Sequence, residues 1–247
     1  MRYLILSDIH ANLEALEAVL AAGVVADATL VLGDMVGYGA DPNAVIERVR
    51  ELPAATIIRG NHDKVGAGLE SVRSFNHLAR HAIEWTAAVL TPEHRQWLTA
   101  LPKGPLIVDG TAEICHGAPF DEDVYIFDDL DAQRALVTSR RPLCLFGHTH
   151  LPAAFRADDT DDSFDSIPIR RDASFDIDLD WDVKYLVNCG AVGQPRDGDW
   201  RAAFGVLDTA ASMLTLKRVP YDVATAQAKI IRAGLPEVLA QRLAVGR

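Results

Sequence analysis

This chain of 247 residues is predicted to fold as one α/β domain over residues 1–247. Short apolar runs of strand length end abruptly at polar residues, and helical patterns lie between them, which is typical of α/β proteins. No internal repeat and no linker rich in Pro, Gly or Ser divides the chain. With 49% hydrophobic and 24% charged residues, the composition suits a soluble domain with one large core.

Five apolar runs predict the first strands, in the segments 3–10, 28–35, 55–63, 112–117 and 143–150. These runs do not alternate with polar residues, so each is expected to be a strand buried on both faces. Three later runs, 184–190, 202–208 and 212–219, predict strands of a second block.

Helix boundaries are marked by capping residues. Asn12 is expected to cap a helix with Leu13, Leu16, Val19 and Leu20 on its apolar face, ended by Gly23. Asp41 before Pro42 predicts a second start, because proline favours the first helical position. Residues 76–90 and 91–101 predict a helical pair, the second capped by Thr91, and Asp222 and Pro236 open two C-terminal helices.

Composition also restricts location and partners. The net charge of −11 without a Lys/Arg cluster argues against binding to a nucleic acid duplex. No apolar stretch reaches the roughly 18 residues of a membrane span, and the N-terminus lacks the features of a signal peptide. Three widely spaced cysteines fit reduced thiols, so we expect a cytoplasmic protein. The acid-rich segment 156–182 is expected to be a surface excursion.

Polar residues of one chemical kind follow each of the first five predicted strands. They are Asp8 and His10, then Asp34, then Asn61, His62 and Asp63, then His116, and finally His148 and His150. Since the C-terminal ends of strands in open α/β sheets face a common crevice, these side chains are expected to meet. Residues i and i+2 of extended backbone point to one side, which predicts that Asp8 and His10 converge. Together the Asp, Asn and His side chains that follow these five strands predict a metal site.

The motifs, in order, are Asp-x-His, Gly-Asp, Gly-Asn-His-Asp, His-Gly and Gly-His-x-His, and they resemble the signature of calcineurin-like metallophosphoesterases. The resemblance covers residues 5–150, and residues 188–199 are also similar to the segment that follows in small bacterial members. Related sequences usually have Asn-Pro-Gly-Ser where this chain has residues 188–191 as Asn-Cys-Gly-Ala, so a proline and a hydroxyl are missing. The resemblance implies a four-layer αββα sandwich, with two mixed β-sheets flanked by helices and a two-metal site at one edge.

The resemblance also implies a role for each motif residue. One metal is held by Asp8, His10 and His150, the other by Asn61, His116 and His148, and both are bridged by Asp34. His62 faces the substrate as general acid or charge stabiliser, and Asp63 orients its ring.

Carboxylate, amide and imidazole ligands without thiolate suit two divalent transition-metal ions, with Mn²⁺ preferred and Fe²⁺, Ni²⁺, Co²⁺ or Zn²⁺ as alternatives. Two such ions lower the pKa of a shared water, and the resulting bridging hydroxide attacks a phosphate ester. No phosphate-binding loop of the G-x-x-x-x-G-K-[ST] kind occurs. A cysteine phosphatase needs an arginine six residues after its cysteine, and none of the three cysteines has one.

Three further residues are candidates for substrate binding. Asn12 and Tyr38 lie just beyond ligand-bearing segments, and Arg196 is a candidate phosphate contact. The structural alternatives are a helix cap for Asn12 and pairing of Arg196 with Asp197 or Asp199.

The expected activity is hydrolysis of a small phosphodiester or phosphomonoester, with a nucleotide-like substrate among the candidates. A dinucleoside polyphosphate hydrolase and a protein phosphatase are alternatives that use the same site, and a nuclease is disfavoured by the acidity of the chain. A non-enzymatic scaffold of the same fold is the alternative from another class, and the complete ligand set with His62 argues against it. A homo-oligomer is compatible with the sequence.

Overall fold

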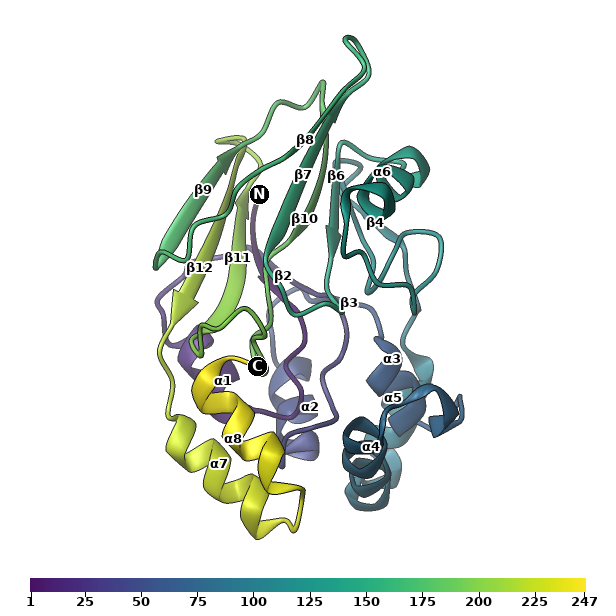
Figure 1. The fold of residues 1–247 in the computed structure, drawn as a ribbon, viewed down its shortest axis with the longest axis vertical. Helices are drawn as coiled ribbons and strands as arrows, with labels where there is room; N and C mark the ends of the chain where they lie inside the picture. Colours follow the sequence, from purple (N-terminus) through teal and green to yellow (C-terminus); the bar gives the residue numbers. More distant parts are fainter.

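Two six-stranded sheets pack face to face in the computed structural model, which describes all 247 residues (Figure 1). The first sheet has the order β3 (Thr56–Ile57), β2 (Ala28–Val31), β1 (Arg2–Leu6), β11 (Ala202–Asp208), β12 (Met213–Val219) and β9 (Ser174–Asp178). The second has the order β4 (Leu106–Val108), β5 (Ala112–Ile114), β6 (Leu143–Phe146), β10 (Lys184–Asn188), β7 (Ala153–Asp158) and β8 (Ser163–Ser166). Both sheets mix parallel and antiparallel pairs.

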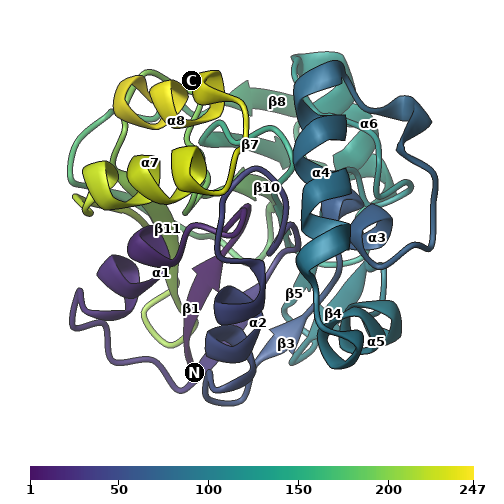
Figure 2. The same cartoon turned by 90° about the horizontal axis from the view of Figure 1, so that it is seen from below.

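Helices cover the outer face of each sheet. The first sheet packs against α1 (Leu13–Leu20), α2 (Pro42–Arg50), α7 (Val223–Arg232) and α8 (Glu237–Val245), and the second against α6 (Asp129–Thr138). The short helix α3 (Asn61–Gly66), the 3₁₀ turn η1 (Val72–Ser74), α4 (His77–Val89) and α5 (Pro92–Ala100) link the two halves. In Figure 2, α7 and α8 lie on one side of the molecule and α3 and α4 on the other.

Three buried clusters of apolar side chains hold these layers together. The largest lies between the first sheet and its helices, where Leu6 and Phe204 meet Leu16 and Ile230. A second fills the space between the sheets, and a third lies under α6. The predicted four-layer αββα sandwich is therefore confirmed.

The predicted capping residues begin the expected helices. Side-chain oxygens of Asn12, Thr91 and Asp222 accept hydrogen bonds from the backbone N–H three residues later, at 3.0–3.1 Å. Asp41 precedes α2 without such a bond, and its carboxylate instead contacts Lys229 at 2.8 Å. This contact ties the start of α2 to α7.

Several features differ from the sequence expectations or add to them. The late strands do not form a separate block, because β10 pairs with β6 in one sheet while β11 pairs with β1 in the other. Residues 61–63 open helix α3 instead of ending a strand. Helix α6 was not predicted. The segment 156–182 contains the end of β7 and all of β8 and β9, so it contributes to the far edges of both sheets.

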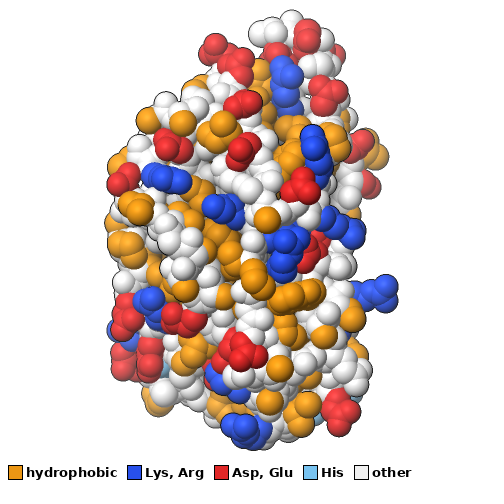
Figure 3. All heavy atoms as spheres, turned by 90° about the vertical axis from the view of Figure 1, so that its left-hand side faces the viewer, with side chains coloured by type: hydrophobic (Ala, Val, Ile, Leu, Met, Phe, Trp, Pro, Cys, Tyr) orange, Lys and Arg blue, Asp and Glu red, His pale blue; other side chains and the backbone are white.

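The β7–β8 hairpin projects from one end of the molecule (Figure 1). Acidic side chains gather at that end in Figure 3, and Lys and Arg side chains are scattered among acids over the rest of this face. Its turn carries Asp158, Asp159, Asp161 and Asp162. None of the helices combines the length and apolar character needed to cross a bilayer. Cys115, Cys144 and Cys189 are free and buried.

Candidate metal centre

All seven proposed ligands follow strands that end at one edge of the molecule. The first sheet supplies β1, β2 and β3, which run parallel, and the second supplies β5 and β6, which are also parallel. Parallel strands direct their C-terminal ends to one side, so the loops after them come together. The crevice thus lies at the edge of the sandwich where these strands of both sheets end.

The buried acids and histidines form two groups that share Asp34. Within each group, potential ligand atoms lie within 4.8 Å of one another; the first contains Asp8, His10, Asp34 and His150, and the second contains Asp34, His116 and His148. Asn61 joins the second group, with its Oδ1 3.2 Å from Nε2 of His116. The structure therefore brings all seven predicted residues together.

Backbone carbonyls orient the histidine rings of the first group. Nδ1 of His10 lies 3.0 Å from the Val36 oxygen, and Nδ1 of His150 lies 2.7 Å from the Gln194 oxygen. A carbonyl oxygen only accepts, so each Nδ1 carries the proton and each Nε2 keeps a lone pair. The two Nε2 atoms are 3.1 Å apart, and that of His150 is 3.4 Å from Oδ1 of Asp8. These electron-rich atoms fit a cation between them.

The second group is arranged by the same principle. Nδ1 of His116 donates to a backbone carbonyl at 2.7 Å, which leaves Nε2 facing Oδ2 of Asp34 at 3.4 Å and Oδ1 of Asn61. His148 uses its other nitrogen, because Nε2 lies 3.2 Å from the carbonyl oxygen of Asp123 and leaves Nδ1 as the ligand atom. An outward-donating N–H with an inward lone pair is usual for histidine ligands of metals.

Burial and the charge of Asp34 set the protonation of this cluster. Burial lowers the pKa of His10 to about 4 and holds that of His150 well below its ordinary value. Burial opposes ionisation of Asp34, yet the facing charge of His116 holds its pKa well below the ordinary value. Against burial, Asp34 raises the pKa of His116 to about 10, and burial raises that of Asp8 to about 6. A divalent cation bound there would displace the proton of His116.

The loops that carry the ligands turn through left-handed backbone conformations. Positive φ angles of 49–67° occur at Asp8, His10, Asp34, His148 and His150. Each costs a non-glycine residue about 1–3 kcal/mol and persists only where the surroundings enforce it. The explanation that Asp8 and His10 converge along an extended strand is therefore wrong, since sharp turns bring them together.

His62 lies beside the two groups without joining either. Its backbone N–H donates to Oδ1 of Asp34 at 2.8 Å. The imidazole centroid lies 4.6 Å from those of Tyr38 and Phe75 and 4.8 Å from that of His10. Nδ1 of His62 is buried without a hydrogen-bond partner. Burial lowers its pKa to about 3, so the ring is a neutral hydrogen-bond donor.

Asp63 does not orient the ring of His62, so that expectation is wrong. Its Oδ1 accepts hydrogen bonds from the backbone N–H groups of Met35 and Val36 at 2.9 and 3.2 Å. Oδ2 accepts from the N–H of Gly60 at 2.9 Å. Asp63 therefore connects the loop that carries Asp34 to the start of α3, and it positions a ligand where the sequence suggested a catalytic partner.

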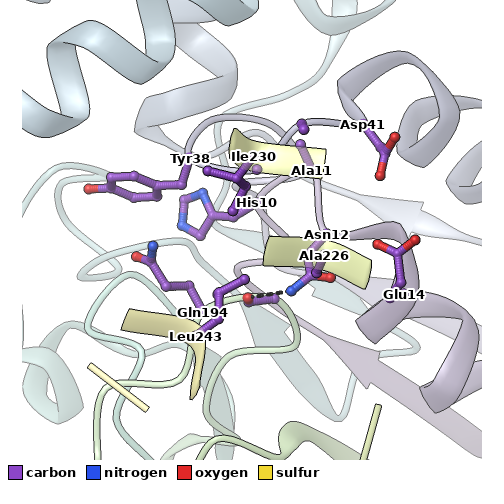
Figure 4. A pocket seen from close by; sticks show the side chains of 13 residues that line it. His10, Ala11, Asn12, Glu14, Tyr38, Asp41, Gln194, Ala226, Ile230 and Leu243 are labelled. Atoms are coloured by element: carbon purple, nitrogen blue, oxygen red, sulfur yellow. Dashed lines mark hydrogen bonds between the residues drawn. The ribbon is translucent and has the colours of Figure 1, made fainter. Parts of the chain in front are cut away.

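Arg196 reaches the same place from the loop after β10. Its Nη2 lies 3.0 Å from Oε1 of Gln194 and 3.4 Å from the Tyr38 hydroxyl, and its Nε is buried without a partner. The carboxylates of Asp197 and Asp199 bind other arginines. Arg196 thus faces the site without a paired carboxylate. Figure 4 shows Tyr38 and Gln194 extending on the same side of His10.

Asn12 has a structural place, with its whole amide used inside the chain. Its Oδ1 caps α1, and its Nδ2 donates to the Gly193 oxygen at 2.8 Å, the dashed line in Figure 4. Asn12 therefore has the helix-capping role that was the alternative to substrate binding. Its hydrogen bond to Gly193 holds the 193–196 loop beside the site.

Several residues near the site carried no signal in the sequence. Phe75, Tyr125 and Lys64 line a hollow beside His62, although none belongs to a recognisable motif. Arg242 of α8 lies near Arg196; burial lowers its pKa, and the charge of Arg196 lowers it further. These residues come from separate loops and helices, so only the tertiary fold brings them together.

Comparisons with known proteins agree with this geometry. The sequence model of the calcineurin-like phosphoesterase superfamily domain matches residues 1–212. An uncharacterized protein of Methanocaldococcus jannaschii is 36% identical over 98% of this chain and 97% of its own length. A metallophosphoesterase structure from Sphaerobacter thermophilus is 40% identical, with a TM-score of 0.88 over 100% of this chain and 99% of that one.

A hypothetical protein of Pyrococcus horikoshii shares the fold, with a TM-score of 0.79 at 20% identity over 100% of this chain and 98% of its own. The family match extends over all the ligand-bearing loops and stops before α7. The chain belongs to the calcineurin-like phosphoesterase superfamily.

Proposed function

We propose that this protein hydrolyses a small phosphodiester or phosphomonoester with the help of two divalent cations, Mn²⁺ being the preferred ion. The observation that carries the proposal is the sharing of Asp34 by two buried ligand groups whose imidazole lone pairs point inward. Neutral imidazole with carboxylate and amide oxygens forms a donor set for divalent transition metals. When bound, a pair of such ions supplies Lewis acidity and an acidified water for displacement at phosphorus.

The residues of the chain divide the remaining tasks. Asp8, His10 and His150 would hold one cation, Asn61, His116 and His148 would hold the other, and Asp34, which belongs to both groups, would contribute to both. The positive charge of Arg196 binds a phosphate oxygen, because the nearby carboxylates of Asp197 and Asp199 are occupied by other arginines. His62 donates a hydrogen bond to the leaving oxygen.

The proposal is tested with protein stripped of metal and reloaded with Mn²⁺. We expect hydrolysis of bis-p-nitrophenyl phosphate or p-nitrophenyl phosphate that requires the metal and disappears in Asp34→Asn. A matched control is Asp27→Asn. The carboxylate of Asp27 accepts a hydrogen bond from the backbone N–H of Arg2 at the N-terminal ends of β1 and β2, opposite the site, so this variant should keep full activity. Absence of turnover with several divalent metals, in folded protein that binds them, would overturn the proposed function.

A further inference from the structure

A hollow of about 650 Å³, including its part open to solvent, lies beside the metal ligands Asn61 and His148. His62 also lines it, so the side of the site from which His62 acts opens directly into this space. A smaller hollow of about 290 Å³ lies beside the first metal group, where His10, Asn12 and Gln194 line it, but His62 does not (Figure 4). A leaving group that accepts a hydrogen bond from His62 would therefore occupy the larger hollow.

Three aromatic rings form part of its wall. The rings of Tyr38 and Phe75 both pack against the proposed donor, each with its centroid 4.6 Å from that of the His62 imidazole. Tyr125 stacks on the ligand His148, with centroids 3.7 Å apart and ring planes at 18°. Flat rings at this spacing offer faces and edges that pack against another flat ring.

The charged residues of the same hollow give it a negative wall. The ammonium group of Lys64 lies 2.7 Å from Glu70 and 2.6 Å from Asp123, and a third carboxylate, that of Glu122, is 3.4 Å away and also pairs with Arg59 at 3.1 Å. Lys64 is thus occupied by acids and not free to bind a phosphate. Glu70 and Asp123 line the hollow with Lys64 as their shared cation, so a leaving group with further phosphates would meet a net negative charge here, and like charges repel at such distances.

We propose that this hollow is the leaving-group subsite and that it selects an alcohol carrying a flat, uncharged aromatic ring over one that carries further phosphates. The inference rests on the proposed phosphoesterase function and narrows its substrate class. In the reaction, water gives its oxygen and one hydrogen to phosphorus. Its other proton passes to the departing oxygen, which leaves with the electron pair of the broken P–O bond.

The first test compares phenyl phosphate with a fluoroalkyl phosphate whose alcohol has similar acidity, using Mn²⁺-loaded protein. Phe75→Leu keeps apolar bulk but removes the flat ring. We expect kcat/KM for phenyl phosphate to fall about 2- to 12-fold, the range that ring packing supplies, with little change for the fluoroalkyl ester. The matched control is Phe164→Leu in β8, whose ring packs against Phe155. The Phe164→Leu variant should change kcat/KM for neither ester.

The second test concerns charge. Wild-type protein should show a higher kcat/KM for phenyl phosphate than for a dinucleoside polyphosphate. Glu70→Gln should lower KM for the polyphosphate and leave KM for phenyl phosphate unchanged. Glu51→Gln, an acid paired with Arg48 on α2, is the control and should leave both KM values unchanged.

These experiments distinguish a failure of the proposed leaving-group subsite from a failure of the proposed phosphoesterase function. Equal kcat/KM for the phenyl and fluoroalkyl esters, or a preference for the polyphosphate, overturns the subsite while the phosphoesterase function stands. Absence of turnover with every ester in metal-loaded protein overturns both.

Discussion

The Nε2 atoms of His10 and His150 face each other at 3.1 Å, while both Nδ1 atoms donate to backbone carbonyls. Burial lowers the pKa of both imidazoles, so neither Nε2 is protonated at neutral pH. Two lone pairs at that distance repel unless a cation lies between them or beside them. The backbone carbonyls that orient the two rings thus favour the binding of a cation at the point where the Nε2 atoms meet.

Removing one histidine from each group is therefore expected to remove one metal at a time. His10→Ala should lose the cation of the first group and His148→Ala that of the second, with a fall in Mn²⁺ content from about two to about one per chain. Elemental analysis of dialysed protein measures this. Loss of both ions in both variants would contradict independent ligand sets, and unchanged content would contradict the assignment of these ligands.

His62→Ala is expected to keep both metals and to lower turnover. The ring contacts no proposed metal ligand through its nitrogens, and its Nδ1 has no partner within the chain. Positioned proton or hydrogen-bond donors contribute about 10²–10⁴-fold, and the loss should be larger for an ester with a poor leaving group. Steady-state kinetics with phenyl and p-nitrophenyl phosphate measure the difference. An equal loss for both would place His62 on a non-bridging phosphate oxygen instead.

Asp63→Asn tests the positioning role of that carboxylate. The amide can accept from Met35 and Val36 through one oxygen, but its NH₂ group would face the N–H of Gly60. An unsatisfied buried donor costs about 1–3 kcal/mol, so thermal unfolding in the presence of EDTA should occur at lower temperature. Mn²⁺ affinity should fall as well, because the loop that carries Asp34 loses an anchor. Normal stability and affinity combined with slower turnover would instead restore a catalytic role.

Gly60→Ala probes the space around Asp34. A methyl group at this position would lie 2.2 Å from Oδ1 of Asp34, while the backbone φ of −104° suits any residue. The carboxylate must move, and we expect loss of metal binding from both groups. Gly23→Ala is the control, since its methyl group would meet no atom within 4 Å but its φ of +72° is strained. It should lower stability and leave Mn²⁺ binding intact, as titration calorimetry would show.

That the seven proposed ligands would meet could be predicted from sequence because parallel strands end at one edge of the fold. Any acid, amide or imidazole placed directly after such a strand is brought to that edge, whichever sheet the strand joins. The same argument could not distinguish β10 from β11, since both are apolar runs and only long-range pairing assigns them to different sheets. The strands β8 and β9 were hidden by acidic residues on exposed edges.

Local geometry was harder to predict than location. His10 and His148 adopt left-handed conformations, which are uncommon for any residue except glycine, and the modest preference of histidine for them is too weak to predict the turns that aim their rings. Asp63 was misplaced because adjacency to His62 says nothing about the direction of its carboxylate, which three backbone N–H groups determine. The aromatic hollow depends on rings from distant segments, such as Phe75 and Tyr125, and has no linear pattern.

The most direct test of the central claim is anomalous scattering from crystals grown with Mn²⁺ and without chelator. Two strong peaks are expected, both within coordination distance of Asp34, one also beside His10 and His150 and the other beside His116 and His148. Asn61 should ligate the second ion, and His62 neither. A single peak, or an absence of metal density beside Asp34, would contradict the dinuclear site.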